Sequence, residues 1–202
     1  RFLSEAEIIE SKGVVRTRAN VLPAAMFLNC KTIERIILPN TLTEISRSCF
    51  SGCINLKEVS MSDATEQIGD YAFNNCVSLE NLTLSSHLKA IENHAFDGCV
   101  SLSEVKLPET VTLIDAYAFN NCKALEEIDI EGTEIKRIND NVFSGCQKLK
   151  NIELPQSVTA IGNDAFINCT ALESIKMSDA ISEIGNNAFE NCPILTSVSI
   201  PD

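Results

Sequence analysis

The chain has few aromatic residues: they make up 5% of its 202 residues, and Trp is absent. Trp and Tyr often anchor tight protein interfaces, so a strong aromatic anchor is not expected. Long apolar runs are also absent. A membrane-spanning helix needs roughly 18 consecutive apolar residues, so we expect no membrane insertion in this segment.

Positive charge is scarce. The 16 Lys and Arg residues are outnumbered by 28 Asp and Glu residues, which gives a net charge of -12. Nucleic acids and anionic membrane surfaces attract basic proteins, so neither is an expected partner.

Catalytic signatures are missing too. The sequence contains no G-x-S-x-G, P-loop or dinucleotide-binding motif. The two histidines, His87 and His94, accompany no evident nucleophile or carboxylate constellation, so we interpret both as surface residues. We therefore expect no enzyme activity, no cofactor and no catalytic residue.

What the sequence does contain is a repeat. Eight of the nine cysteines recur at steps of 23 residues, with a single step of 24, and a Phe precedes each of them by three residues. These cysteines are Cys30, Cys53, Cys76, Cys99, Cys122, Cys146, Cys169 and Cys192. A period in this range is typical of a solenoid, in which each repeat buries its apolar face only by stacking on its neighbours.

The fullest copy shows how each repeat is expected to fold. Val105 and Leu107 alternate as in a short strand, and Pro108 follows, where the missing backbone N–H ends the ladder. A second apolar pair, Val111 and Ile114, comes next. The residue after that Ile is mostly of a helix N-cap type, and the residue before each repeat Cys is always Gly or Asn, as at a helix C-terminus. We therefore predict a short helical or 3₁₀ turn that ends near the Ala-Phe pair.

Stacking these copies predicts an α/β repeat fold. The expected architecture is a leucine-rich repeat solenoid, with a curved parallel sheet on the concave face and short helical or 3₁₀ turns on the convex face. We treat residues 1–202 as a single domain in which residues 22–202 form about eight repeats. Residues 1–21 depart from the pattern and are expected to form an irregular N-terminal cap containing a hairpin. No polar cap follows the eighth strand, so we expect the natural array to continue or another domain to cover the C-terminal end.

The pattern L-x-x-I-x-L-P-x-x-V-x-x-I-x-x-x-A-F-x-N/G-C closely resembles the BspA-type class of leucine-rich repeats. Copies in this chain include IERIILPNTLTEISRSCFSGC and LSEVKLPETVTLIDAYAFNNC, and the resemblance covers residues 22–202. This class is found mostly in surface or secreted proteins of bacteria and some protists. The resemblance therefore implies a cell-surface or secreted location and an adhesive or other partner-binding role, with no catalytic residues.

The cysteines are expected to be free thiols. Eight of them share one column that the stack would bury, and their Cβ vectors should run parallel rather than converge as a disulfide requires. Cys49, the ninth, falls in a column that most other repeats fill with Ala, which suits a small core residue. Cys49 and Cys53 would make half of a zinc site, but no second ligand pair accompanies them, so no metal is expected.

The outward residues of the predicted strands hold the candidate binding site. They vary between repeats, and acidic residues gather on neighbouring strands in the fourth to sixth repeats. One interpretation is an acidic patch for a basic partner or a cation, with candidate binding residues Glu104, Lys106, Glu127, Asp129, Glu131 and Glu153. The other is a solvated face on which Lys106–Asp129 and Glu153–Lys176 form cross-strand ion pairs.

Two functions fit these observations. The chain is either a protein–protein or adhesion module of a cell-surface or secreted protein, or a structural spacer without a ligand of its own. Solenoids offer extended concave surfaces for binding, which favours the first. The expected partner is a protein or a host or cell-surface macromolecule of unknown identity, and the chain is expected to be monomeric.

Overall fold

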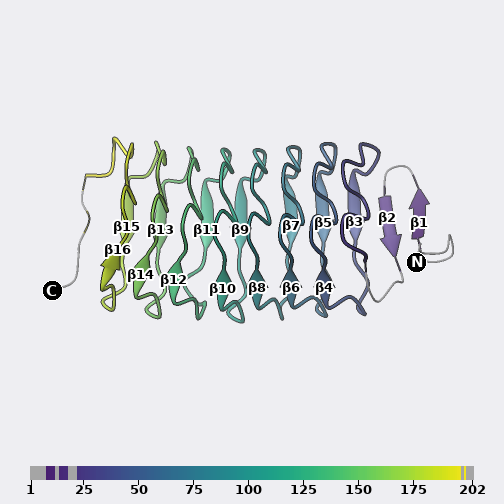
Figure 1. Ribbon diagram of the computed structural model, residues 1–202, viewed down its shortest axis with the longest axis horizontal. Coiled ribbons are helices and arrows are strands. Elements are labelled where there is room, and N and C mark those ends of the chain that lie inside the picture. Colours follow the sequence, from purple (N-terminus) through teal and green to yellow (C-terminus); the bar gives the residue numbers. More distant parts are fainter. Residues whose placement is uncertain (1–7, 12–13, 18–21, 197, 199–202) are drawn as a thin grey trace.

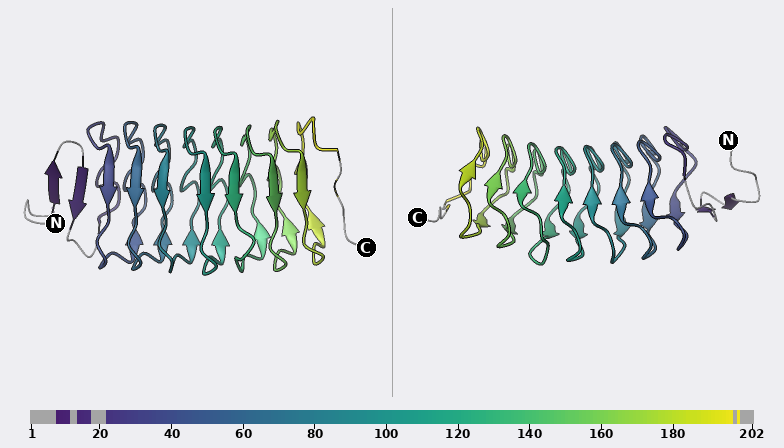
Figure 2. Two further views of the ribbon diagram at one scale, coloured as in Figure 1. Left: turned by 180° about the vertical axis from the view of Figure 1, so that it is seen from behind. Right: turned by 60° about the horizontal axis from the view of Figure 1, so that its bottom comes forward.

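The computed structural model describes residues 8–11, 14–17, 22–196 and 198. Its coils lie side by side in one long row, and each complete coil contributes two short strands to it (Figure 1). The row is gently bowed when it is turned about its long axis (Figure 2).

The first strand of each coil lies in a series along one face, which we call the strand face. Its members are β3 (Arg35–Ile37), β5 (Glu58–Ser60), β7 (Asn81–Thr83), β9 (Glu104–Lys106), β11 (Glu127–Asp129), β13 (Asn151–Glu153) and β15 (Ser174–Lys176). All pairing between them is parallel and in register with the sequence repeat, so Ile36 lies beside Val59 and Val59 beside Leu82.

The second strands are shorter and form another parallel series. They are β4 (Glu44–Ile45), β6 (Gln67–Ile68), β8 (Ala90–Ile91), β10 (Leu113–Ile114), β12 (Arg137–Ile138), β14 (Ala160–Ile161) and β16 (Glu183–Ile184). Each ends in the second apolar residue that the repeat predicts. Ile45, Ile68, Ile91, Ile138 and Ile161 are completely buried, as a column facing the interior should be.

The predicted N-terminal hairpin is present. β1 (Ile8–Ser11) pairs antiparallel with β2 (Val14–Thr17), and β2 pairs parallel with β3 of the first coil. The hairpin therefore supplies the strand that the first coil would otherwise lack on that side.

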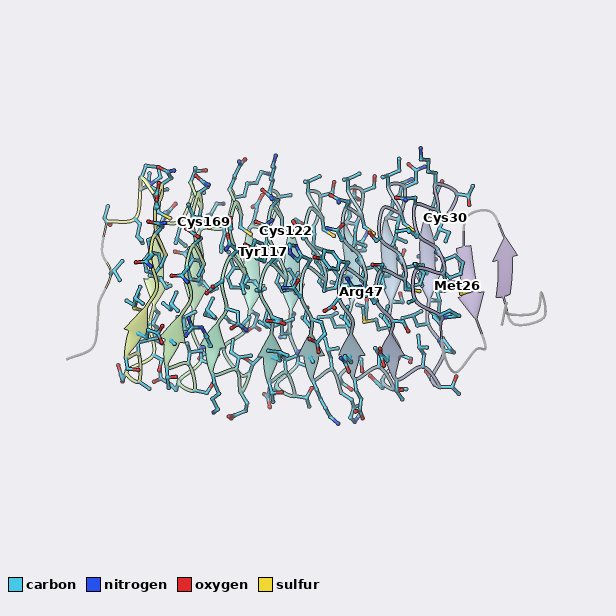
Figure 3. All side chains as sticks on the ribbon, viewed as in Figure 1. Met26, Cys30, Arg47, Tyr117, Cys122 and Cys169 are labelled. Carbon is cyan, nitrogen blue, oxygen red and sulfur yellow. The ribbon has the colours of Figure 1, made fainter. Side chains whose placement is uncertain are left out.

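The interior is built from ladders of identical residues. Phe rings of successive coils stack nearly parallel, with centroids 5.2–6.0 Å apart from Phe27 to Phe189. Each repeat thiol beyond the first donates a hydrogen bond to the Phe carbonyl of the preceding coil, as Cys99 Sγ does to Phe73 O at 3.2 Å. The labelled Cys30, Cys122 and Cys169 lie along one line through the stack (Figure 3).

The helical turns predicted for the convex face were wrong, because the described residues contain neither α-helix nor 3₁₀ helix. The backbone N–H groups there alternate between two kinds of acceptor. Ala72 and Asn74 bond to the carbonyls of Gly69 and Tyr71 within their own coil, whereas Tyr71 and Phe73 bond to the carbonyls of the next coil. A helix needs every successive N–H for its own turn, so this segment is a third ladder between coils.

Left-handed residues explain why the helix signals misled. The Gly or Asn before each repeat Cys has a φ between 55° and 76°, as predicted. A second column with φ between 52° and 60° was not predicted: Ala25, Ser48, Tyr71, His94, Tyr117, Asn141, Asp164 and Asn187. Two left-handed residues four positions apart prevent any helical run between them.

Asn and Gly alternate in the column before the cysteines. Asn29, Asn75 and Asn121 each precede a coil with Gly, and their side chains lie where a Cβ on Gly52, Gly98 or Gly145 would be. Each Asn therefore fills the space that the next coil leaves open. The last two coils break the alternation, because both carry Asn in this column. Asn191 Nδ2 donates a hydrogen bond to Asn168 Oδ1 at 3.0 Å.

The sheets are not continuous along the row. The first series has no ladder pairing between β7 and β9 or between β11 and β13, and the second has none between β10 and β12. Two of these breaks flank the single 24-residue step, from Cys122 to Cys146. The extra residue lies in the segment Glu131–Glu134, four residues long where the preceding repeat has the three residues 108–110.

Candidate functional site

Five of the six candidate residues lie on three neighbouring strands of the strand face, and Glu131 lies in the turn that follows β11. Glu104 and Lys106 belong to β9, Glu127 and Asp129 to β11, and Glu153 to β13. The β9–β11 register places Glu104 beside Glu127 and Lys106 beside Asp129. Like charges directly opposite each other repel, so the first of these pairs adds negative potential to the face rather than stability.

Both predicted cross-strand ion pairs are formed. Lys106 Nζ lies 3.6 Å from Asp129 Oδ2, and Lys176 Nζ pairs with Glu153 Oε1, which raises the pKa of Lys176 by hydrogen bonding and charge attraction. Exposed pairs of this kind contribute about 0–1 kcal/mol each. Glu104, Glu127 and Glu131 have no ion-pair partner within the described part of the chain, so part of the acidic charge stays uncompensated.

The break between β11 and β13 leaves backbone groups without their usual partners. In regular coils the carbonyl before the strand accepts two N–H groups from the next coil, as Ser103 O does from Glu126 at 2.9 Å and Glu127 at 3.4 Å. Glu126 O receives neither equivalent bond, because Lys150 N and Asn151 N donate to no carbonyl of the described preceding coil. The strand face is therefore opened at this step.

A groove of about 710 Å³ lies over the break. It is lined by β11, β13 and their flanking residues, and by two residues of β15: Glu126, Glu127, Ile128, Asp129, Ile130, Glu131, Lys150, Asn151, Ile152, Glu153, Ser174 and Lys176. A second hollow of about 210 Å³ adjoins it at the longer segment and shares Glu131 and Glu153 with it. The two hollows together extend from the unpaired strands to the segment that holds the extra residue.

The structure gathers four of the six predicted residues in this groove and leaves two outside. Glu127, Asp129, Glu131 and Glu153 line it, whereas Glu104 and Lys106 lie one strand away on β9. Lys150, Asn151 and Ser174 were not predicted as groove residues. The sequence signal nearest to them is the 24-residue step, although the break between β7 and β9 lies at a regular 23-residue step.

A stacked group of side chains on another face was also missed. His94 lies between Tyr71 and Tyr117, with ring centroids 4.7 and 4.4 Å away, and Arg47 sits 5.6 Å from the centre of the Tyr71 ring. His94 Nδ1 is 2.8 Å from Asp97 Oδ2. His94 is half-buried in this stack, whereas His87 is exposed. The faces of the His94 ring are occupied, so the stack offers no open aromatic platform.

The thiols in the described part of the chain are mostly buried and free. Burial raises the pKa of Cys49, Cys53 and Cys169 to about 12, which keeps these thiols protonated and unreactive near neutral pH. The prediction that all eight repeat cysteines are buried was wrong for Cys30 and Cys192, which are partly exposed in the first and last coils. Among the described residues, no group of three or more His, Cys, Asp or Glu is placed to hold a metal ion.

Comparison with known families agrees with this architecture. The family model for the BspA type leucine rich repeat region, with six copies of the repeat, matches residues 20–150 and 114–202. This chain belongs to the BspA-type leucine-rich repeat family. No curated protein sequence matches it.

Solved bacterial structures share the fold. A leucine-rich repeat protein of Eubacterium ventriosum is 18% identical, with a TM-score of 0.57 over 88% of this chain and 75% of that one. The T. pallidum leucine rich repeat protein is 23% identical, with a TM-score of 0.52 over 79% of this chain and 82% of that one. The pneumococcal vaccine antigen PcpA is 19% identical, with a TM-score of 0.50 over 85% of this chain and 61% of that one.

The described part of the chain contains no helix of the length and apolar character that crossing a bilayer requires.

Proposed function

We propose that this chain is a partner-binding module of a cell-surface or secreted protein and that it binds through the acidic part of its strand face. The observation that carries the proposal is the position of Glu127, Asp129, Glu131 and Glu153 around one groove, at one of the breaks in the strand face. Solenoids use extended faces of this kind for recognition. Carboxylates on neighbouring strands also lie within about 10 Å, the distance over which charges act jointly at physiological salt.

The location rests on resemblance. The resemblance to BspA-type repeats implied a surface or secreted protein, and the chain belongs to that family. The similar pneumococcal protein carries the name vaccine antigen. An adhesive role, in which the partner is a host or cell-surface macromolecule, is the finer form of the same proposal.

A binding experiment tests it. The immobilised chain is presented with purified extracellular-matrix proteins and cell-wall material, and binding is measured by interferometry at low and physiological salt. We expect the double substitution Glu127→Lys and Asp129→Lys to weaken binding about tenfold or more and to reduce its salt dependence, because charge reversal removes the attraction. Unchanged melting would show that the fold is intact.

A matched control separates this site from the overall charge. Glu80 and Glu190 are exposed, lie away from the groove and have no ion-pair partner among the described residues, so Glu80→Lys with Glu190→Lys changes the net charge by the same amount. Equal weakening by the two double variants would reduce the acidic patch to a solvated face. No binding to any surface would favour a structural spacer instead.

A further inference from the structure

The groove between β11 and β13 combines an interruption of backbone pairing, which the step between β7 and β9 shares, with a concentration of acidic charge. At paired positions the N–H that follows a strand bonds to the next coil, as Leu107 N does to Asp129 O at 3.0 Å. Ile130 N makes no such hydrogen bond to Glu153 O. The N–H groups of Lys150 and Asn151 likewise donate to no carbonyl of the described preceding coil. Unpaired strand edges are the places where extended chains dock on sheets.

The acidic residues along one wall of the groove have the period of a strand. Glu127, Asp129 and Glu131 alternate with Ile128 and Ile130, which are only 5% and 1% exposed and therefore face the interior. Alternate residues of an extended chain are about 6.5–7 Å apart. Glu127 and Asp129 have this interval on β11, Glu131 follows in the turn after the strand, and all three line the groove.

The lysines of the groove do not neutralise the negative charge of this wall. Of the lining residues, five are acidic and two are lysines. Lys176 is paired with Glu153, and Lys150 Nζ lies 3.8 Å from Glu126 Oε2, so both lysines already have acidic partners. Glu127 and Glu131 have no ion pair among the described residues.

We propose that the groove seats an extended segment of a partner protein that carries Lys or Arg at every second position. The cationic side chains on one face of such a segment would meet Glu127, Asp129 and Glu131 in turn, and its backbone would lie over the open edges of β11 and β13. This rests on the proposed function and narrows it, because it names the chemistry and the spacing of the partner's contact segment.

Two peptides of equal charge test the spacing directly. One has the sequence Ser-Arg-Ser-Arg-Ser-Arg-Ser and the other the sequence Arg-Arg-Arg-Ser-Ser-Ser-Ser, both labelled with fluorescein and titrated with the chain in 0.15 M salt. We expect the alternating peptide to bind about fivefold more tightly or better, because only its arginines match the interval of the carboxylates. Equal affinity, or no binding of either peptide, would overturn the inference.

Two variants locate the binding. Glu127→Gln with Glu131→Gln keeps the shape of the groove and should weaken the alternating peptide about tenfold, the effect of losing two exposed ion pairs. Glu80→Gln with Glu190→Gln removes the same charge elsewhere and should change the affinity less than twofold. If the control loses as much, attraction to the whole acidic chain explains the binding and the groove does not.

The outcomes keep the two proposals apart. If the peptides fail to discriminate while the chain still retains a surface partner that Glu127→Lys with Asp129→Lys releases, the alternating segment is wrong and the binding module stands. If no partner is retained in that experiment either, the module itself is wrong.

Discussion

The interior ladders and both strand series pass through the longer coil, but only the strand series lose their pairing there. Phe119 and Phe143 remain stacked across the 24-residue step at 6.0 Å, and Cys146 Sγ still donates to Phe119 O at 3.3 Å. On the strand face the same step removes the pairing of β11 with β13. Side-chain packing absorbs a small displacement, whereas strand pairing depends on register. The core and the strand face can therefore change separately in this fold.

The largest expected effect tests whether the interior thiols act together. Burial raises the pKa of Cys49, Cys53 and Cys169 from 9.0 to about 12, so between pH 9 and 12 the unfolded chain loses protons that the folded chain keeps. Stability is then complete below pH 9 and should fall as the pH rises, by about 1.4 kcal/mol per thiol and pH unit. Urea unfolding at pH 8, 9 and 10 under reducing conditions measures it.

Removing one thiol sharpens this test. Cys122 is completely buried and burial raises its pKa, so Cys122→Ala should make the loss of stability above pH 9 less steep, whatever it costs at pH 8. An unchanged slope would assign the alkaline transition to Lys and Tyr instead. Thiol titration should find little reaction in the folded chain and nine thiols after unfolding.

A smaller effect is expected from Phe119→Ala. Phe119 is completely buried and stacks on Phe96 at 5.4 Å, so its loss should cost about 3–5 kcal/mol. The control is Glu104→Gln on the strand face, where an exposed change should stay within about 0.5 kcal/mol. Denaturant unfolding curves compare them. Similar values for the two variants would show that the Phe column does not dominate the core.

The smallest expected effect comes from restoring the regular step. Deleting Gly132 gives this coil 23 residues, so β11 and β13 should pair and the amides of Lys150 and Asn151 should exchange hydrogen more slowly. Stability should change by only about 1 kcal/mol, because the interior ladders are already continuous. Gly132→Ala keeps the longer step and should leave exchange fast. If exchange stays fast after the deletion, chain length is not what opens the strand face.

The strand positions and the interior columns could be predicted because the repeat reports them many times over. Val105, Ile128 and Ile152 recur at one place in each coil and are buried as expected. The convex turns could not be predicted in the same way. Gly or Asn before a Cys signals a left-handed residue, and such a residue ends a helix or shapes a tight turn equally well. Tyr71 and His94 carry no signal of their own left-handed backbone.

The charges of the candidate site were visible in the sequence and its shape was not. Glu127, Asp129 and Glu131 alternate as outward residues must, which placed them on one face. Whether neighbouring strands pair depends on the path of the whole coil between them. The extra residue near Gly132 was evident as a longer step, but its effect on a strand about twenty residues later needs the three-dimensional arrangement.

The alternation of Asn29, Asn75 and Asn121 with glycine makes two coils, rather than one, the natural building block of most of this array. Excising a single Asn coil would leave Gly facing Gly, with a space that no side chain fills. Excising a single Gly coil would bring two Asn together, an arrangement that Asn168 and Asn191 already adopt. Lengthening or shortening the array in steps of two coils preserves the original contacts. The structural unit of the array is therefore two coils, or 46 residues, twice the 23-residue repeat.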